Sequence, residues 1–207
     1  GEVPSEDQII ASNSYGLCAL FEQNGAEVRL LPIARDTVPA LQLAFDLAKG
    51  ADLIITIGGA SVGDHDLVGQ VAVGQGMQRA FYKVAMRPGK PLMAGRLGDA
   101  VMIGLPGNPV SAMVCGHIFV LPLLRKMLGL GTATAPRMKA RLSNSLSANG
   151  PREHYMRARI EDGNVTVYDR QDSALLTVLA DANCLAVRPP NDGSRLPDDR
   201  IEIILLT

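Results

Sequence analysis

The sequence predicts an α/β domain with a mostly parallel sheet, followed by a small all-β domain, and three observations lead to this. Helix-like and strand-like patterns alternate over residues 13–128, as they do in α/β domains. Beyond residue 137 nearly every pattern is a short strand bounded by turn residues. A run of small residues, GLGTATAP at 129–136, separates the two parts. We therefore expect domains over residues 1–132 and 137–207.

The elements of the first part follow from hydrophobic periodicity and from residues that start or stop them. Asn13 and Ser14 suit a helix start, and Gly50 suits a helix end. Asn108 is a suitable N-cap for a long helix, with Pro109 in its first turn. The segment DLIITI is almost wholly apolar, as a strand buried on both faces of a sheet would be. Helices are expected over residues 13–25, 37–49, 66–73 and from 109, and strands over 26–31, 52–57, 81–86, 91–95 and 100–104.

The second part has the pattern of a small β-barrel or sandwich of about 70 residues. Asn-Gly, Asp-Gly and Asn-Asp-Gly turns separate its apolar runs. Strands are expected over residues 138–146, 155–160, 165–168, 184–187 and 201–206, with one short helix over 175–180.

Composition narrows the class of protein. The net charge of −1 gives no general attraction to nucleic acid or to an anionic membrane. The three cysteines form no close pair, which argues against a disulfide framework or a CxxC metal site and fits a reducing cytoplasm. The start, GEVPSEDQ, lacks the features of a signal peptide. The apolar stretch 110–124 is short for a membrane span, so we interpret it as a buried helix.

The first of three segments suited to chemistry is GGASVGDHD at 58–66. Consecutive glycines let the backbone approach a ligand and present N–H groups to an anion, and Ser61 adds a hydroxyl. Asp64 and Asp66 could hold a divalent cation that neutralises phosphate charge. The alternative is a plain strand–helix turn in which one of the two aspartates caps the helix, and on this segment alone we favour that alternative.

The second segment, residues 83–96, holds two lysines, two arginines and no acid. Lys83 and Arg87 differ by an even offset, so on one strand they would face the same way. Pro88-Gly89 would then turn the chain and present Lys90. Arginine suits forked contacts with phosphate oxygens, and lysine acts as a mobile point charge. A solvated basic strand edge is an equally good interpretation.

The third segment is GLPGNPVS at 104–111. A stiff loop that leads into a helix N-terminus forms an anion site from unpaired N–H groups. A well-capped buried helix is the alternative, and both roles use the same groups. The histidines lack metal-ligand spacing: His117 is expected in a buried helix, and only His65, between two aspartates, invites a test.

Taken in order and spacing, GGASVGDHD, KVAMRPGKP and GLPGNPVSA resemble the molybdopterin molybdenumtransferase family of the MoeA/gephyrin type. The segments SNSYGLCALFEQNGAEV and IARD near the start and SALLTVLADANCLAVRPP near the end extend this resemblance over almost the whole chain. It implies a molybdopterin-binding three-layer domain followed by a barrel-like domain. It also implies an enzyme that inserts molybdate into adenylylated molybdopterin with release of AMP, assisted by Mg²⁺.

The resemblance implies roles for particular residues. Those that would cradle phosphate or pterin are Gly58, Gly59, Ser61 and Gly63. Those that would complete the cleft are Pro106, Gly107, Asn108 and Pro109. Lys83, Arg87 and Lys90 would hold molybdate and the phosphates of the ligand, although relatives often have lysine at the position of Arg87. Asp36 and Asp66 would be the acidic groups near the reaction centre, with Asp64 and Asp66 beside the metal.

Family members carry an additional N-terminal half that forms a dimer, and nothing in this sequence resembles it. The resemblance therefore implies a homodimer for the full-length form, an upstream molybdopterin adenylyltransferase that supplies the substrate, and little activity for this chain alone. Two alternatives stay open: an adenylyltransferase relative with the same α/β fold, and a non-catalytic module that binds molybdopterin or anchors proteins.

Overall fold

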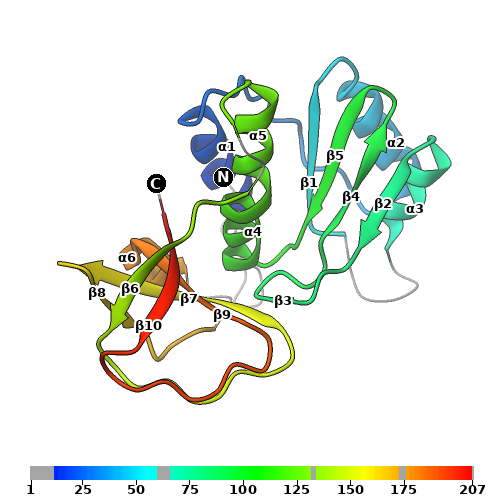
Figure 1. The fold of residues 1–207 in the computed structure, drawn as a ribbon. Helices are drawn as coiled ribbons and strands as arrows, with labels where there is room; N and C mark the ends of the chain where they lie inside the picture. Colours follow the sequence, from blue (N-terminus) through cyan, green and yellow to red (C-terminus); the bar gives the residue numbers. More distant parts are fainter. Residues whose placement is uncertain (1–11, 60–65, 132–133, 173–175, 207) are drawn as a thin grey trace.

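The computed structural model describes residues 12–59, 66–131, 134–172 and 176–206 (Figure 1). Its first sheet has four strands in the order β1-β5-β4-β2, formed by β1 (Leu53–Ile57), β5 (Ala100–Leu105), β4 (Met93–Leu97) and β2 (Gln78–Tyr82). Strands β1 and β5 run parallel, but β4 is antiparallel to both of its neighbours. The sheet is mixed, and the expectation of a mostly parallel sheet is wrong. The reason is the tight turn between β4 and β5 at Gly98, which can join only antiparallel strands.

Helices cover both faces of this sheet, which gives the expected three layers (Figure 1). On one face, α2 (Val38–Leu47) and α3 (Leu67–Gly74) pack in a core that includes Phe45, Val71 and Met102. On the other face lie α1 (Asn13–Glu22), α4 (Pro109–Cys115) and α5 (Leu121–Met127). Alternating strand faces thus point into two separate apolar layers.

Helix α4 continues through a π-helical turn, Gly116–Val120, into α5. The combined helix Pro109–Met127 is long and apolar enough to cross a membrane by length and composition, yet 67% of its most apolar window is buried within the fold. The expected buried helix is therefore confirmed.

Three local expectations fail. Residues 26–31 form no strand, because no ladder pairs them with the described strands, although Ala26 and Val28 still pack on the core. Strand β1 is half-buried rather than buried, because it lies at the edge of the sheet with β5 as its neighbour. The strand expected over 81–86 begins three residues earlier and ends at Tyr82, because Lys83 adopts a left-handed φ of 72°.

The second part is a closed barrel, which decides between barrel and sandwich. It contains β6 (Met138–Leu142), β7 (Glu153–Glu161), β8 (Asn164–Val167), β9 (Cys184–Arg188) and β10 (Arg200–Leu205), with the short helix α6 (Leu176–Asp181) beside it. The strands follow the order β7-β8-β6-β10-β9, and β9 pairs back with β7 to close the ring. Alternate residues such as Leu142, Val165 and Ile203 fill its interior.

The short strand β3 (Met86–Arg87) joins the two parts of the chain. It leaves the first sheet and pairs in parallel with β7, so that Arg87 lies in register with His154. One apolar core also contains Leu92 and Val110 from the first part and Leu185 from the barrel. The division into residues 1–132 and 137–207 stays a prediction, because this strand and this core connect the two sheets.

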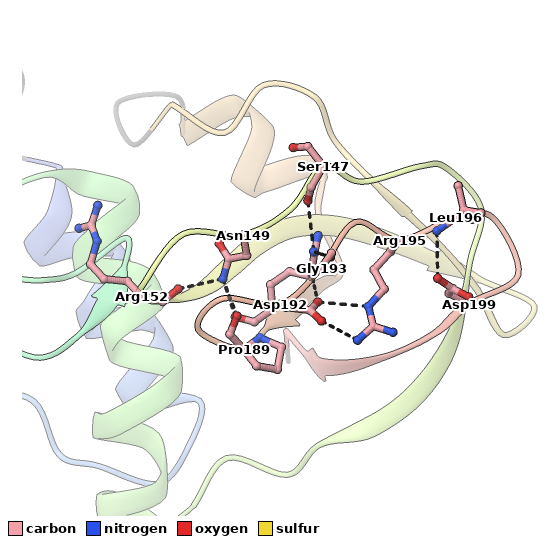
Figure 2. Close-up of polar contacts among 10 residues, drawn as sticks. Ser147, Asn149, Arg152, Pro189, Asp192, Gly193, Arg195, Leu196 and Asp199 are labelled. Atoms are coloured by element: carbon pink, nitrogen blue, oxygen red, sulfur yellow. Dashed lines mark hydrogen bonds and ion pairs between the residues drawn. The ribbon is translucent and has the colours of Figure 1, made fainter.

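A buried ionic cluster ties together two loops at one end of the barrel (Figure 2). Arg188, at 2% exposure, donates from Nε to Oδ2 of Asp192 at 2.5 Å, and Arg195 donates from Nη2 to Oδ1 at 2.6 Å. These bonds, led by that from Arg195, hold the pKa of the Asp192 carboxyl below its ordinary value. Asn149 adds a bond from Nδ2 to the carbonyl oxygen of Pro189 at 2.7 Å. This end of the barrel is therefore rigidly braced.

Candidate functional site

Two glycine-bearing loops meet at the carboxyl ends of the parallel strands β1 and β5. A Cβ built on Gly107 would lie 3.3 Å from the Cα atom of Gly58, so these backbones touch. The amide of Gly58 also donates to the carbonyl oxygen of Leu105 at 3.0 Å. Gly58 and Gly59 have φ values of 79° and 71°, a region that favours glycine. The structure thus brings the first and third sequence segments together where open α/β sheets bind ligands.

Asn13 fastens the third segment to helix α1. Its Nδ2 donates to the carbonyl oxygen of Gly107 at 2.7 Å. Asn13 is the first residue of the helix, and Ser12 occupies the N-cap position. The side chain of Asn13 is thus used to hold the Gly107 loop and not to cap the helix. The side-chain oxygens of Asn13 and Asn108 are buried and have no hydrogen-bond partner among the described residues. Asn108 does occupy the N-cap position of α4, but its side chain makes no capping bond.

Asp66 lies seven residues after Gly59 and is the N-cap of helix α3. It is 6% exposed, and its Oδ1 accepts a hydrogen bond from the amide of Gly69 at 2.9 Å. The plain interpretation of this residue, a helix cap, is therefore true. The carboxylate lies against the first turn of α3, where a Cβ on Gly69 would overlap it.

Tyr82 connects Asp66 with the basic segment. The Nζ atom of Lys83 lies 4.9 Å from the centre of the Tyr82 ring, and the guanidinium of Arg79 lies 5.3 Å from it. Desolvation, followed by the charge of Asp66, raises the pKa of the Tyr82 hydroxyl. Lys83, Tyr82 and Asp66 thus form one neighbourhood at the end of β2, and the sequence analysis missed the tyrosine because an aromatic residue in a strand is usually core.

The basic segment forms a closed loop rather than a strand. The amide of Lys83 donates to Leu92 at 2.8 Å, and that of Val84 donates to Lys90 at 3.1 Å. Gly89 has a φ of 104°, and a Cβ there would lie 2.5 Å from the Sγ atom of the buried Cys115. Helix α4 therefore supports the turn that presents Lys90.

Lys83 and Arg87 do not share a strand face, contrary to the expectation from their spacing. Lys83 ends β2 with its left-handed φ, whereas Arg87 belongs to β3 in the barrel sheet. Both are exposed, as is Lys90, and none of the three has an ion pair within the described residues. Their charges remain available for an anionic ligand.

Arg87 lies at the junction with the barrel, beside the buried His154. Burial, followed by the charges of Arg87 and three further arginines, lowers the pKa of His154 to about 4. The further arginines are Arg157, Arg188 and Arg152. His154 is therefore neutral at pH 7, and the field at this junction is positive.

Several residues that the sequence predicts for the site have no described contact with the glycine junction or the basic loop. Asp36 is exposed before α2 and makes no hydrogen bond or ion pair with the other described site residues. Ser61, Gly63, Asp64 and His65 lie outside the described residues. Among the described residues no group of three or more histidine, cysteine or acidic side chains could hold a metal ion. Pro106 and Pro109 are buried and stiffen the loop on either side of Gly107.

The class of protein that this arrangement defines is an α/β domain with a glycine junction at the carboxyl ends of two parallel strands, suited to an anionic ligand. The same domain presents three exposed cations that have no ion pair within the described residues. Residues 2–126 match the family described as "Probable molybdopterin binding domain", and residues 139–206 match the "MoeA C-terminal region (domain IV)". The chain belongs to the family of the probable molybdopterin binding domain, and its second part is similar to the MoeA C-terminal region.

Known relatives agree with this assignment. A molybdopterin molybdenumtransferase of a Nostoc species is 38% identical over 88% of this chain and 44% of its own length. Molybdopterin molybdenumtransferase 2 of Mycobacterium tuberculosis is 36% identical over 95% of this chain and 48% of its own length. The crystal structure of a molybdopterin biosynthesis MoeA protein from Pyrococcus horikoshii has a TM-score of 0.84 at 25% identity, and the match covers 99% of this chain and 50% of that one. The chain spans about half the length of these relatives.

Proposed function

We propose that this chain forms the molybdopterin-binding part of a molybdopterin molybdenumtransferase. In this reaction molybdate is inserted into adenylylated molybdopterin and AMP is released. The observation that carries the proposal is the contact between Gly58 and Gly107 at the carboxyl ends of β1 and β5. Backbone N–H groups and the start of α4 would bind phosphate oxygens there.

The three cations would bind anionic groups of the ligand in addition to those bound at the glycine junction. Lys83 stands at the end of β2, close to Tyr82, and would bind molybdate or the phosphate nearest Asp66. Lys90 projects from the turn supported by Cys115 and would bind a second anionic group. Arg87, at the barrel junction, would add a forked contact. Holding two anions in mutual register is the main contribution that such a site makes to catalysis.

Magnesium suits this arrangement as a partner of the ligand rather than of the protein alone. Mg²⁺ is often held by one or two carboxylates together with phosphate oxygens. Among the described residues Asp66 offers a buried carboxylate that follows the glycine pair, and the family resemblance adds Asp64 as a candidate. Bound there, Mg²⁺ would neutralise phosphate charge while Asp66 holds its position through Gly69.

The experiment is direct binding of AMP, of molybdate and of molybdopterin to this chain, and AMP release from adenylylated molybdopterin by the full-length protein in the presence of Mg²⁺. Saturable binding that fails in Lys83→Ala and Lys90→Ala supports the proposal. If neither substitution changes the affinity, the result would favour the alternative of a non-catalytic module that anchors other proteins. The match of the second part to the MoeA C-terminal region disfavours an adenylyltransferase relative.

For the full-length protein we propose a homodimer in the cytoplasm that takes its substrate from a molybdopterin adenylyltransferase. This part of the proposal rests on the family resemblance. Co-purification of the adenylyltransferase and a sedimentation measurement of oligomeric state would test it.

A further inference from the structure

A separate pocket lies between the long helix and the end of the barrel. Its volume is about 200 Å³. One face of the helix supplies His117, Leu121, Pro122 and Arg125, and the other walls are residues 135–138 with Ile204 and Leu205. None of these residues belongs to the glycine junction or to the basic loop. The pocket is therefore distinct from the site of the proposed function.

The π-helical turn explains why side chains of the helix line a cavity here. The turn Gly116–Val120 contains His117, and Pro122 follows in the next turn. A π-turn widens the helix and shifts the side chains after it relative to those before it, and such turns often occur at functional sites. Proline lacks an N–H group, so the regular hydrogen bonds are further weakened at this point.

The two arginines that line the pocket differ in their bonding. Arg137 is fully engaged, because it donates to Glu202 at 3.0 Å, to Glu153 at 3.1 Å and to Tyr155 at 3.3 Å. Arg125 is half-buried, and its side chain makes no hydrogen bond or ion pair within the described residues. The pocket thus contains one cation that lacks a counter-ion.

The remaining walls are apolar or neutral. Leu121, Pro122 and Ile204 are apolar and buried, and Ala135 and Pro136 close the side formed by the linker. Burial lowers the pKa of His117 to about 4, so its ring is neutral at pH 7 and can accept or donate a hydrogen bond. An engineered apolar cavity of about 150 Å³ holds a benzene molecule, so this pocket has room for a single ring-sized group.

We propose that this pocket binds a small monocarboxylate that carries one ring-sized apolar group. The carboxylate would form a charge-assisted pair with Arg125, and the apolar group would lie against Leu121, Pro122 and Ile204. A lone arginine in the last turn of a helix also interacts favourably with the helix dipole, which would place it there without any ligand. Ligand binding is what separates the two explanations.

The test is a titration of the chain with benzoate, followed by amide shifts in ¹H–¹⁵N spectra. We expect saturable shifts at His117, Arg125 and Ile204, with an affinity between about 0.1 and 10 mM for so small a ligand. Benzamide, which has the same shape without the charge, should bind about tenfold more weakly.

Matched variants complete the experiment. Arg125→Gln should weaken benzoate binding about tenfold, whereas Lys126→Gln, an exposed neighbour outside the pocket, should not change it. Ala135→Leu should block binding by filling the pocket while leaving Arg125 in place. The proposal is overturned if benzoate gives no saturable shifts, if the shifts lie only around Lys83 and Lys90, or if both pocket variants bind like the wild type.

Discussion

The side chain of Asn13 joins the start of helix α1 to the loop before α4 through a hydrogen bond of 2.7 Å from Nδ2 to the carbonyl oxygen of Gly107. The two residues are 94 positions apart in the chain. Gly107 in turn lies against Gly58, so Asn13 helps to hold the contact between the two glycine loops, together with the bond from the Gly58 amide to Leu105. The geometry of the proposed site thus depends on a residue outside all three segments that the sequence analysis selected for chemistry.

Asn13→Ala should therefore loosen the site more than it destabilises the protein. We expect the free energy of unfolding to fall by about 1 kcal/mol, as for the loss of one hydrogen bond, and the affinity for AMP to fall about tenfold. Denaturant unfolding and calorimetry measure the two effects. Asn24→Ala is the matched control, because Asn24 donates to Leu20 at 2.8 Å at the opposite end of the same helix. If both variants lose the same affinity for AMP, Asn13 does not have a specific role in positioning the Gly107 loop.

Gly59→Ala should destabilise the fold at the glycine pair. Its φ of 71° is unfavourable for alanine, and the added Cβ would lie 2.2 Å from Cγ2 of Val68. We expect a loss of about 1–3 kcal/mol in the free energy of unfolding. Gly74→Ala is the control, because nothing lies within 4 Å of a Cβ there and its φ is not left-handed. Equal stability of the two variants in thermal denaturation would contradict the crowding argument.

Lys90→Ala should weaken binding of phosphate-bearing ligands by about 1–3 kcal/mol, because a charged hydrogen bond is lost. Lys90 is exposed, so much of its contribution should disappear as the salt concentration rises. Calorimetry with AMP at two salt concentrations measures both effects. Lys126→Ala, an exposed lysine at the far end of α5, should leave AMP binding unchanged. An affinity for AMP that neither Lys90→Ala nor added salt reduces would count against the assignment.

Asp192→Asn should destabilise the barrel, because it leaves the buried guanidinium of Arg188 without its counter-ion. We expect a loss of about 3 kcal/mol. The folded-state pKa of Asp192 is lower than its ordinary value of 3.8, so this stability is present above pH 3.8 and is lost as the pH falls below it. Denaturant unfolding at pH 7 and at pH 3 measures the loss.

Asp198→Asn is the control for that measurement. Asp198 is 81% exposed and lies 3.6 Å from Arg141, so its ion pair should contribute less than about 1 kcal/mol. If the two variants are equally stable at pH 7, the cluster at the end of the barrel does not brace it.

Elements with strong periodicity could be predicted from sequence, and those set by tertiary pairing could not. The barrel strands, the long buried helix and the turn at Gly50 all follow from patterns within a few residues. The direction of β4 follows from the two-residue turn at Gly98, a local hairpin signal that the expectation of a mostly parallel sheet left out. The burial of β1 depends on its place at the sheet edge, which is a long-range property that a local pattern does not contain.

The same distinction applies to the site. The glycine loops and the lysines could be found because their residue types are unusual at strand ends. Asn13 and Tyr82 could not, since an asparagine at a helix start normally indicates a cap and a tyrosine normally indicates core. The even offset between Lys83 and Arg87 predicts a shared face only if both residues belong to one strand. Strand β2 ends before Lys83, which has a left-handed φ, so the two side chains do not share a face.

Asp66→Asn separates a structural role from a chemical one. Asparagine and aspartate cap helices about equally well, and asparagine keeps an oxygen that can accept from Gly69, so the melting temperature should change little. The substitution removes a buried negative charge beside Tyr82, where the proposed site would hold a metal ion and an incoming anion. We therefore expect the full-length protein with this change to fold, to bind AMP and to lose molybdenum insertion. The assay measures AMP release from adenylylated molybdopterin and reconstitution of a molybdenum enzyme, next to thermal denaturation. Retained insertion with a lowered melting temperature would show that Asp66 is only the cap of α3.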